Sequence, residues 1–134
     1  MSEQVIESKL VKRFEDLKVW QEARGLAGSI YQVTKNPRFA SDFDLTRQIR
    51  RAAVSVMANI SEGFGRLTVK DRRQFLITSR GSLTELQSHL YIALDQGYLT
   101  EIDFRKTMEH SILVSKLLNG LIGYLNSNNE RMNK

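Results

Sequence analysis

The chain has 134 residues, of which 41% are hydrophobic and 26% charged, with a net charge of +5 and a pI of about 9.7. This length suits one domain, and this balance is typical of a chain that buries a core. The absence of cysteine excludes a disulfide framework and any Cys-ligated metal site. No segment has the apolar length of a signal peptide or a membrane span, so we expect a cytoplasmic protein with no membrane partner.

Four long stretches carry apolar residues at three- and four-residue spacing, which predicts four helices. The first covers residues 16–35, with Asp16 as its N-cap and Asn36-Pro37 at its end. Its inward face is predicted to hold Leu17, Trp20, Ala23, Ala27, Ile30 and Tyr31.

The second predicted helix covers residues 42–62 and opens with Ser41 and Asp44 in a capping-box-like arrangement. Gly63 and Gly65 end it, and the turn at residues 63–66 reverses the chain. Its inward stripe is Leu45, Ile49, Ala52, Val56 and Ile60. Small residues beside that stripe let another helix approach closely, namely Ala53, Ser55, Ala58 and Ser61.

The third and fourth helices begin with a similar capping pattern. Thr68 and Asp71 start the third helix, and Thr100 and Asp103 start the fourth. Gly97 is the predicted stop between them. The third helix, ending near residue 96, is predicted to bury Leu76, Ser79, Leu83, Leu86, Leu90 and Ala93. The seam of the fourth is Phe104, Met108, Ser111, Ser115, Leu118, Ile122 and Leu125.

Short connections between four long helices predict an all-α, antiparallel up-down-up-down four-helix bundle. We place the bundle at residues 14–125, between a flexible N-terminal segment at 1–13 and a frayed C-terminal tail at 126–134. The fourth helix also carries apolar residues outside its seam, which indicates a protein–protein surface. These residues are Ile112, Leu113, Val114, Leu117, Leu121 and Tyr124.

Residues suited to catalysis or metal binding are few. Glu85 and His89 are four apart and Glu109 adjoins His110, whereas a di-iron bundle uses Glu-x-x-His. The turn at residues 63–65 follows a helix and lacks the Lys-Ser/Thr ending of a phosphate-binding P-loop. We therefore expect a non-enzymatic protein with no catalytic residue, metal site or cofactor.

Three polar residues lie beside the predicted apolar faces: Asn59, Glu62 and Glu85. We interpret them as groups that set helix register through hydrogen bonds. Glu85 is expected to pair with Arg50 or Arg51, in which case those arginines are structural.

Basic residues are concentrated in one part of the chain. Residues 47–80 hold eight basic and two acidic residues, a net charge of +6, whereas the rest of the chain sums to −1. Arginine binds phosphate oxygens in bidentate fashion, so these residues are candidates for one nucleic-acid-binding patch. The alternative is a solvated face with ordinary ion pairs. The candidates are Arg47, Arg50, Arg51, Arg66, Lys70, Arg72 and Arg73.

Several segments resemble the four-helix bundle proteins encoded in intervening sequences of bacterial 23S rRNA genes. They are Phe14-Glu15-Asp16-Leu17-Lys18-Val19-Trp20, Gln48-Ile49-Arg50-Arg51-Ala52-Ala53-Val54-Ser55-Val56, Ala58-Asn59-Ile60, Glu62-Gly63, Gly65-Arg66, Gly81-Ser82-Leu83-Thr84-Glu85-Leu86 and Gly97-Tyr98-Leu99. The resemblance implies a left-handed bundle that assembles as a ring-like homopentamer. It also extends to reverse-transcriptase accessory proteins of diversity-generating retroelements, which use basic surfaces on nucleic acid.

The chain departs from that family pattern at Met57, where the family often has proline. Proline would kink the helix, so Met57 predicts a straight segment. A kink that shapes the subunit interface would matter for the pentamer and not for the bundle.

Three functions follow from the sequence. The leading prediction is a homo-oligomer that binds RNA or another nucleic acid through the basic patch. The second is an accessory or scaffold subunit whose fourth helix docks a larger protein, and the third is a purely structural oligomer.

Overall fold

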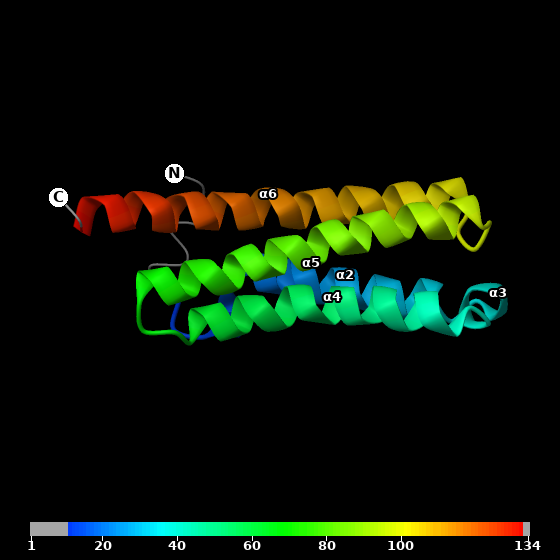
Figure 1. Cartoon of the computed structure of the whole chain (residues 1–134), viewed down its shortest axis with the longest axis horizontal. Helices are drawn as coiled ribbons and strands as arrows, with labels where there is room; N and C mark the ends of the chain where they lie inside the picture. The colour runs from blue at the N-terminus through cyan, green and yellow to red at the C-terminus, as the bar shows by residue number, and fades with distance from the viewer. Residues whose placement is uncertain (1–10, 133–134) are drawn as a thin grey trace.

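The protein is an antiparallel bundle of four long helices. The computed structural model describes the backbone of residues 11–132 and the side chains of residues 11–127. Its elements are η1 (Phe14–Asp16), α2 (Lys18–Val33), α3 (Pro37–Ala40), α4 (Phe43–Phe64), α5 (Val69–Asp95) and α6 (Glu101–Met132). The four long helices run alternately up and down, with α3 at one end of the bundle (Figure 1). The predicted fold class is confirmed.

The core follows the predicted stripes in α4 and α5. All five inward residues predicted for α4 are buried, as are all six predicted for α5. In α2 the buried face is rotated relative to the predicted one: Val19 and Leu26 are buried, whereas Tyr31 is 40% exposed. Trp20 is half-buried against the core, with its ring 5.1 Å from that of Phe14. Tyr31 was therefore assigned to the wrong side of its helix.

Small residues bring α4 and α5 together, as the sequence predicts. The Ser79 hydroxyl donates to the Val56 carbonyl across the two helices at 2.7 Å, and the Ser55 and Ser82 hydroxyls are 2.8 Å apart. The half-buried Asn59 amide joins this network by donating to Ser55. The register role predicted for Asn59 is therefore supported by this network, whereas Glu62 and Glu85 are exposed.

Two of the four predicted helix starts are wrong. Leu17, not Asp16, is the residue before α2, because Asp16 belongs to η1 and no side chain caps this helix. Asp42, not Ser41, caps α4 by accepting from the Leu45 N–H at 3.1 Å. Thr68 and Thr100 accept from backbone N–H groups three residues later, as predicted.

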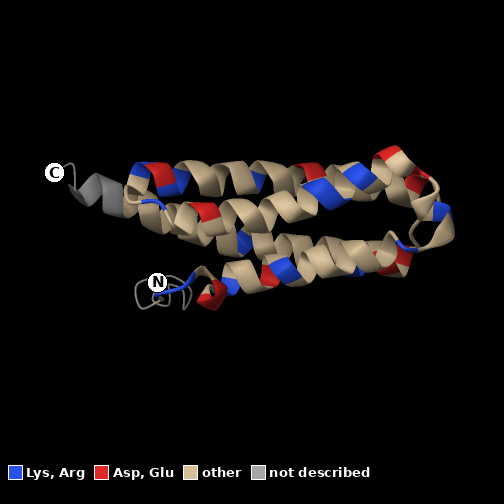
Figure 2. Cartoon of the chain, turned by 90° about the horizontal axis from the view of Figure 1, so that it is seen from below, with Lys and Arg blue, Asp and Glu red and all other residues tan. Residues whose placement is uncertain are grey.

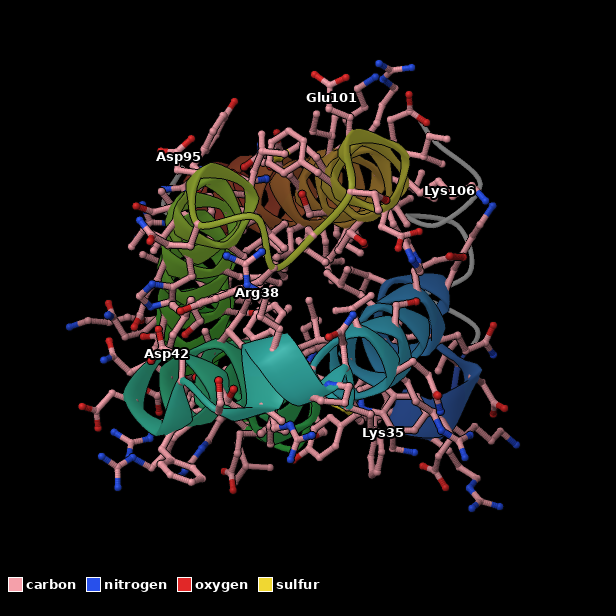
Figure 3. All side chains as sticks on the ribbon, turned by 90° about the vertical axis from the view of Figure 1, so that its right-hand side faces the viewer. Lys35, Arg38, Asp42, Asp95, Glu101 and Lys106 are labelled. Atoms are coloured by element: carbon pink, nitrogen blue, oxygen red, sulfur yellow. The ribbon has the colours of Figure 1, made fainter. Side chains whose placement is uncertain are left out.

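The connection after α2 is more ordered than predicted. Asn36-Pro37 does not merely end a helix: Asn36 caps α3, and Pro37 occupies its first turn, where no N–H is needed. The guanidinium of Arg38 then donates to the Gly97 carbonyl at 3.4 Å, which joins α3 to the α5–α6 turn (Figure 3). Gly97 has a φ of +72°, a conformation that favours glycine and ends α5.

Helix α6 buries more of its apolar residues than predicted. Val114 and Leu121 are core residues, and Leu117 and Tyr124 pack against the core, because this face of α6 lies against α2 as well as α5. Only Ile112 and Leu113 of the predicted extra surface are exposed. The helix continues to Met132 without a break at residue 126. Most of the predicted N-terminal segment, residues 1–10, lies outside the described residues.

Candidate nucleic-acid interface

The predicted basic patch is divided between the two ends of α4. Arg47, Arg50 and Arg51 lie in its first half, and we call them the α4 arginines. The turn cluster lies at the other end and consists of Arg66, Lys70, Arg72 and Arg73. At a rise of about 1.5 Å per residue, α4 holds Arg47 about 22 Å from Glu62, beside the turn cluster. Blue segments are spread along the length of the bundle in Figure 2 and are not gathered at one end. That both groups contact one nucleic acid stays a prediction.

The α4 arginines differ in how they are held. Arg47 forms an ion pair with Asp44 at 3.0 Å, and both side chains are well exposed. Arg50 is half-buried: its Nε donates to the Thr34 hydroxyl at 2.8 Å, and its guanidinium lies 4.6 Å from the centre of the Tyr31 ring. Arg51 is exposed and has no polar partner among the described residues. Arg47 and Arg51 therefore face solvent, whereas Arg50 is held in place by Thr34 and Tyr31.

A shallow groove accompanies the α4 arginines. It has a volume of about 460 Å³ and is lined by Tyr31 of α2 and by Phe43, Thr46, Arg47, Arg50, Arg51 and Val54 of α4. The Phe43 ring is 81% exposed, and Tyr31 and Val54 are also exposed. Apolar and cationic groups thus share one surface of the bundle.

The turn cluster is more involved in holding the chain together. Arg66 pairs with Glu62 at 3.1 Å and lies over the Phe75 ring at 4.5 Å. The Nε of Arg72 donates to the Arg66 carbonyl at 2.7 Å. The half-buried Arg73 donates to the Asn126 side chain, which joins α5 to α6.

Glu85 does not pair with Arg50 or Arg51, contrary to the prediction. Its carboxylate accepts a hydrogen bond from no arginine in the described part of the chain and instead lies 3.2 Å from His89 Nε2, one turn along α5. Helix geometry favours this contact because residues four apart share one side.

Two histidine contacts remain outside the basic surface. His110 Nε2 lies 3.2 Å from Glu22, which connects α6 to α2, and His89 Nδ1 is buried without a hydrogen-bond partner. No group of three or more residues suited to metal binding occurs within the described part of the chain. Nor does any of its helices have the length and apolar character needed to cross a membrane.

Tyr31 and Phe43 were not recognised as site residues from the sequence. Tyr31 was placed in the core because it follows Ile30 at the edge of an apolar stripe. A signal for Phe43 was present: it precedes Arg47 by four residues, so both must lie on the same side of α4.

The fold and this surface define an all-α helical bundle with an arginine-rich face. The family model for the 23S rRNA-intervening sequence protein matches residues 15–120, and the chain belongs to that family. Its fold is similar to the 1.70 Å crystal structure of a protein of unknown function from the S23 ribosomal protein family of Bacteroides thetaiotaomicron VPI-5482. The two share 23% identity over 78% of this chain and 97% of the other, with a TM-score of 0.72. No curated protein sequence matches the chain.

Proposed function

We propose that this protein is a non-enzymatic homo-oligomer that binds RNA, or another nucleic acid, mainly through the α4 arginines. The observation that carries the proposal is the outward position of Arg47 and Arg51 on one exposed side of α4. Only Asp44 opposes them in an ion pair among the described residues. Exposed arginines attract phosphates, and an exposed ion pair such as Arg47–Asp44 is weak enough to be exchanged for one.

The turn cluster has a secondary part in this proposal. Lys70 is exposed and has no polar partner among the described residues, and Arg72 is exposed and contacts the Arg66 carbonyl through its Nε. These groups provide a second, weaker phosphate contact at the other end of α4. A long nucleic acid can touch both ends, whereas a short one cannot.

Assembly strengthens such binding. The family resemblance implies a ring of five copies, and repeating one cationic surface around a ring raises avidity without any new contact. Contacts made to phosphates carry little base preference. We therefore expect binding that depends on nucleic-acid length and salt more than on sequence.

The test is multi-angle light scattering of the protein with and without a structured RNA, at about 50 mM and about 200 mM salt. We expect an oligomer that gains RNA mass at the lower salt and loses it at the higher one, because phosphate contacts release counterions. An oligomer that gains no RNA mass at either salt contradicts the proposal. A monomer contradicts the homo-oligomer.

A second function is favoured by a different surface. Ile112 and Leu113 are adjacent on α6, and both are exposed, at 43% and 40%. An apolar surface of this kind suits an accessory subunit that docks a larger protein. Capture of that protein would persist at high salt, which distinguishes it from RNA binding.

A further inference from the structure

We infer that the groove between α2 and α4 binds single-stranded nucleic acid, with bases stacked on Phe43 and Tyr31 and phosphates held by Arg47 and Arg51. This inference rests on the proposed function and adds the form of nucleic acid that the surface recognises. Its basis is the combination of exposed rings and exposed cations in one groove.

The position of Phe43 is not required by the fold. Phe43 is the first residue of α4, but Asp42 provides the cap of that helix, and the neighbouring Phe39 already fills the core and is fully buried. The Phe43 ring is left facing solvent, with most of its surface exposed. An exposed ring that serves neither cap nor core is available to a ligand.

One ring and two cations follow one another along one side of α4. Phe43, Arg47, Arg51 and Val54 are spaced by three or four residues, so they form a stripe about 16 Å long. A single strand offers stackable bases and phosphates in alternation, and proteins that bind single strands combine aromatic platforms with a cationic groove. The stripe has the same two components.

Arg50 fixes the other ring. Its guanidinium covers one side of Tyr31, and the Nε–H···Thr34 hydrogen bond holds it there. Thr34 is buried and donates in turn to the Ile30 carbonyl at 2.7 Å, so this arrangement is tied to the backbone of α2. A planar guanidinium is itself a stacking surface for bases. The platform is therefore ordered before a ligand binds, which lowers the entropic cost of binding.

The charges favour a polyanion over a second copy or another protein. The groove is lined by three arginines and by no carboxylate. Lys35, which follows α2, lies on the outer side of α2 and α4 in the end-on view of Figure 3 and adds to the positive charge there. A duplex would satisfy the arginines but keeps its bases stacked inside, so it cannot use the rings. Only a single strand uses both.

The experiment measures fluorescence anisotropy of a labelled oligo-adenylate of about 12 nucleotides and of an RNA duplex of matched length, at about 50 mM salt. Phe43→Leu removes the ring and keeps an apolar side chain, whereas Phe43→Tyr keeps the ring. Leu67→Ala is the matched control, since Leu67 is 96% exposed at the opposite end of α4. Light scattering of each variant reports whether assembly has changed.

We expect Phe43→Leu to weaken single-strand binding about 10-fold and duplex binding less than about twofold, because each stacked base contributes substantially. Phe43→Tyr and Leu67→Ala should bind like the unmodified protein. An Arg47→Glu/Arg51→Glu variant should lose both ligands.

Three outcomes overturn the inference. If Phe43→Leu binds both ligands normally while Arg47→Glu/Arg51→Glu loses them, the stacking inference fails and the proposed function stands. If Phe43→Leu instead changes the oligomeric mass, the groove is an interface between copies. If Arg47→Glu/Arg51→Glu still binds both ligands, the proposed function fails as well.

Discussion

The α4 arginines and the turn cluster have similar composition and different surroundings. In the turn cluster, Arg66 and Arg73 contact a carboxylate and an amide of the same chain, and Arg73 joins two helices. Among the α4 arginines, Arg51 has no polar partner in the described part of the chain, and Arg47 has only an exposed one. The number of basic residues in a segment therefore does not measure how many are available to a ligand.

The largest expected effect tests this difference directly. Arg47→Glu/Arg51→Glu should weaken RNA binding by about 100-fold at about 50 mM salt and lower the salt slope of binding by about 2, since each phosphate contact releases nearly one counterion. Lys70→Glu/Arg72→Glu makes the same change in charge at the turn cluster and should cost less than about 10-fold. Filter binding across a salt series measures both. Equal losses would show that the two ends of α4 contribute alike.

The contacts that the turn cluster makes within the chain should contribute to the free energy of unfolding. Arg73→Met keeps most of the side-chain stem and removes the hydrogen bond to Asn126, so the free energy of unfolding should fall by about 1–2 kcal/mol. Arg51→Met should change it by less than about 0.5 kcal/mol, because Arg51 is exposed. Urea denaturation followed by circular dichroism gives both values. An unchanged Arg73→Met variant would mean that the Arg73–Asn126 contact does not hold α5 to α6.

Smaller effects should follow removal of the acidic partner in each region. Asp44→Asn frees Arg47 and removes a negative charge near the groove, so RNA should bind about two- to fivefold more tightly. The loss of a carboxylate from the first turn of α4 should cost less than about 1 kcal/mol of stability. Glu62→Gln, its counterpart beside Arg66, should leave RNA affinity within about twofold. A larger gain from Glu62→Gln would place the main binding surface at the turn cluster.

The smallest effect concerns how stability depends on pH through a contact at the N-terminus of α4. The Tyr98 hydroxyl donates to the Asp42 carboxylate at 3.1 Å, and this hydrogen bond, followed by burial, raises the pKa of Tyr98. A raised pKa means that the contact stabilises the fold below the usual tyrosine pKa of about 10 and is lost as pH rises through the higher folded value. Tyr98→Phe should therefore lose less stability than the unmodified protein between neutral pH and about pH 11. Equal losses in urea midpoint would exclude this linkage.

Much of the fold was predictable because each helix carries its own signals. The buried stripe of α5 from Leu76 to Ala93 was predicted completely, and Thr68 and Gly97 mark its two ends. These signals are local, since they depend on helical spacing and on backbone groups within a few residues. Met57 also lies in an unbroken α4, as the departure from the family pattern predicts.

The wrong predictions concern residues whose burial or hydrogen bonding depends on the position of a neighbouring helix. Tyr31 lies at the edge of an apolar stripe, and its direction depends on the position of α4 and on Arg50 above its ring. Val114 and Leu121 looked like excess surface on α6 until the position of α2 showed that they belong to the core. Asp42 capped α4 in place of Ser41, whose hydroxyl donates to the Arg38 carbonyl of α3.

By itself, the sequence determined four helices, most of their buried stripes, and the segments that resemble the family. Periodicity and capping sufficed for this, because they act within a single helix. Only the tertiary structure decided that α4 divides the basic residues between two ends, that Glu85 meets His89 and no arginine, and that Tyr31 and Phe43 share a groove with Arg47 and Arg51. The physical reason is that the partner of a charged or aromatic side chain is set by which helix lies beside it, and spacing along one helix does not contain that information.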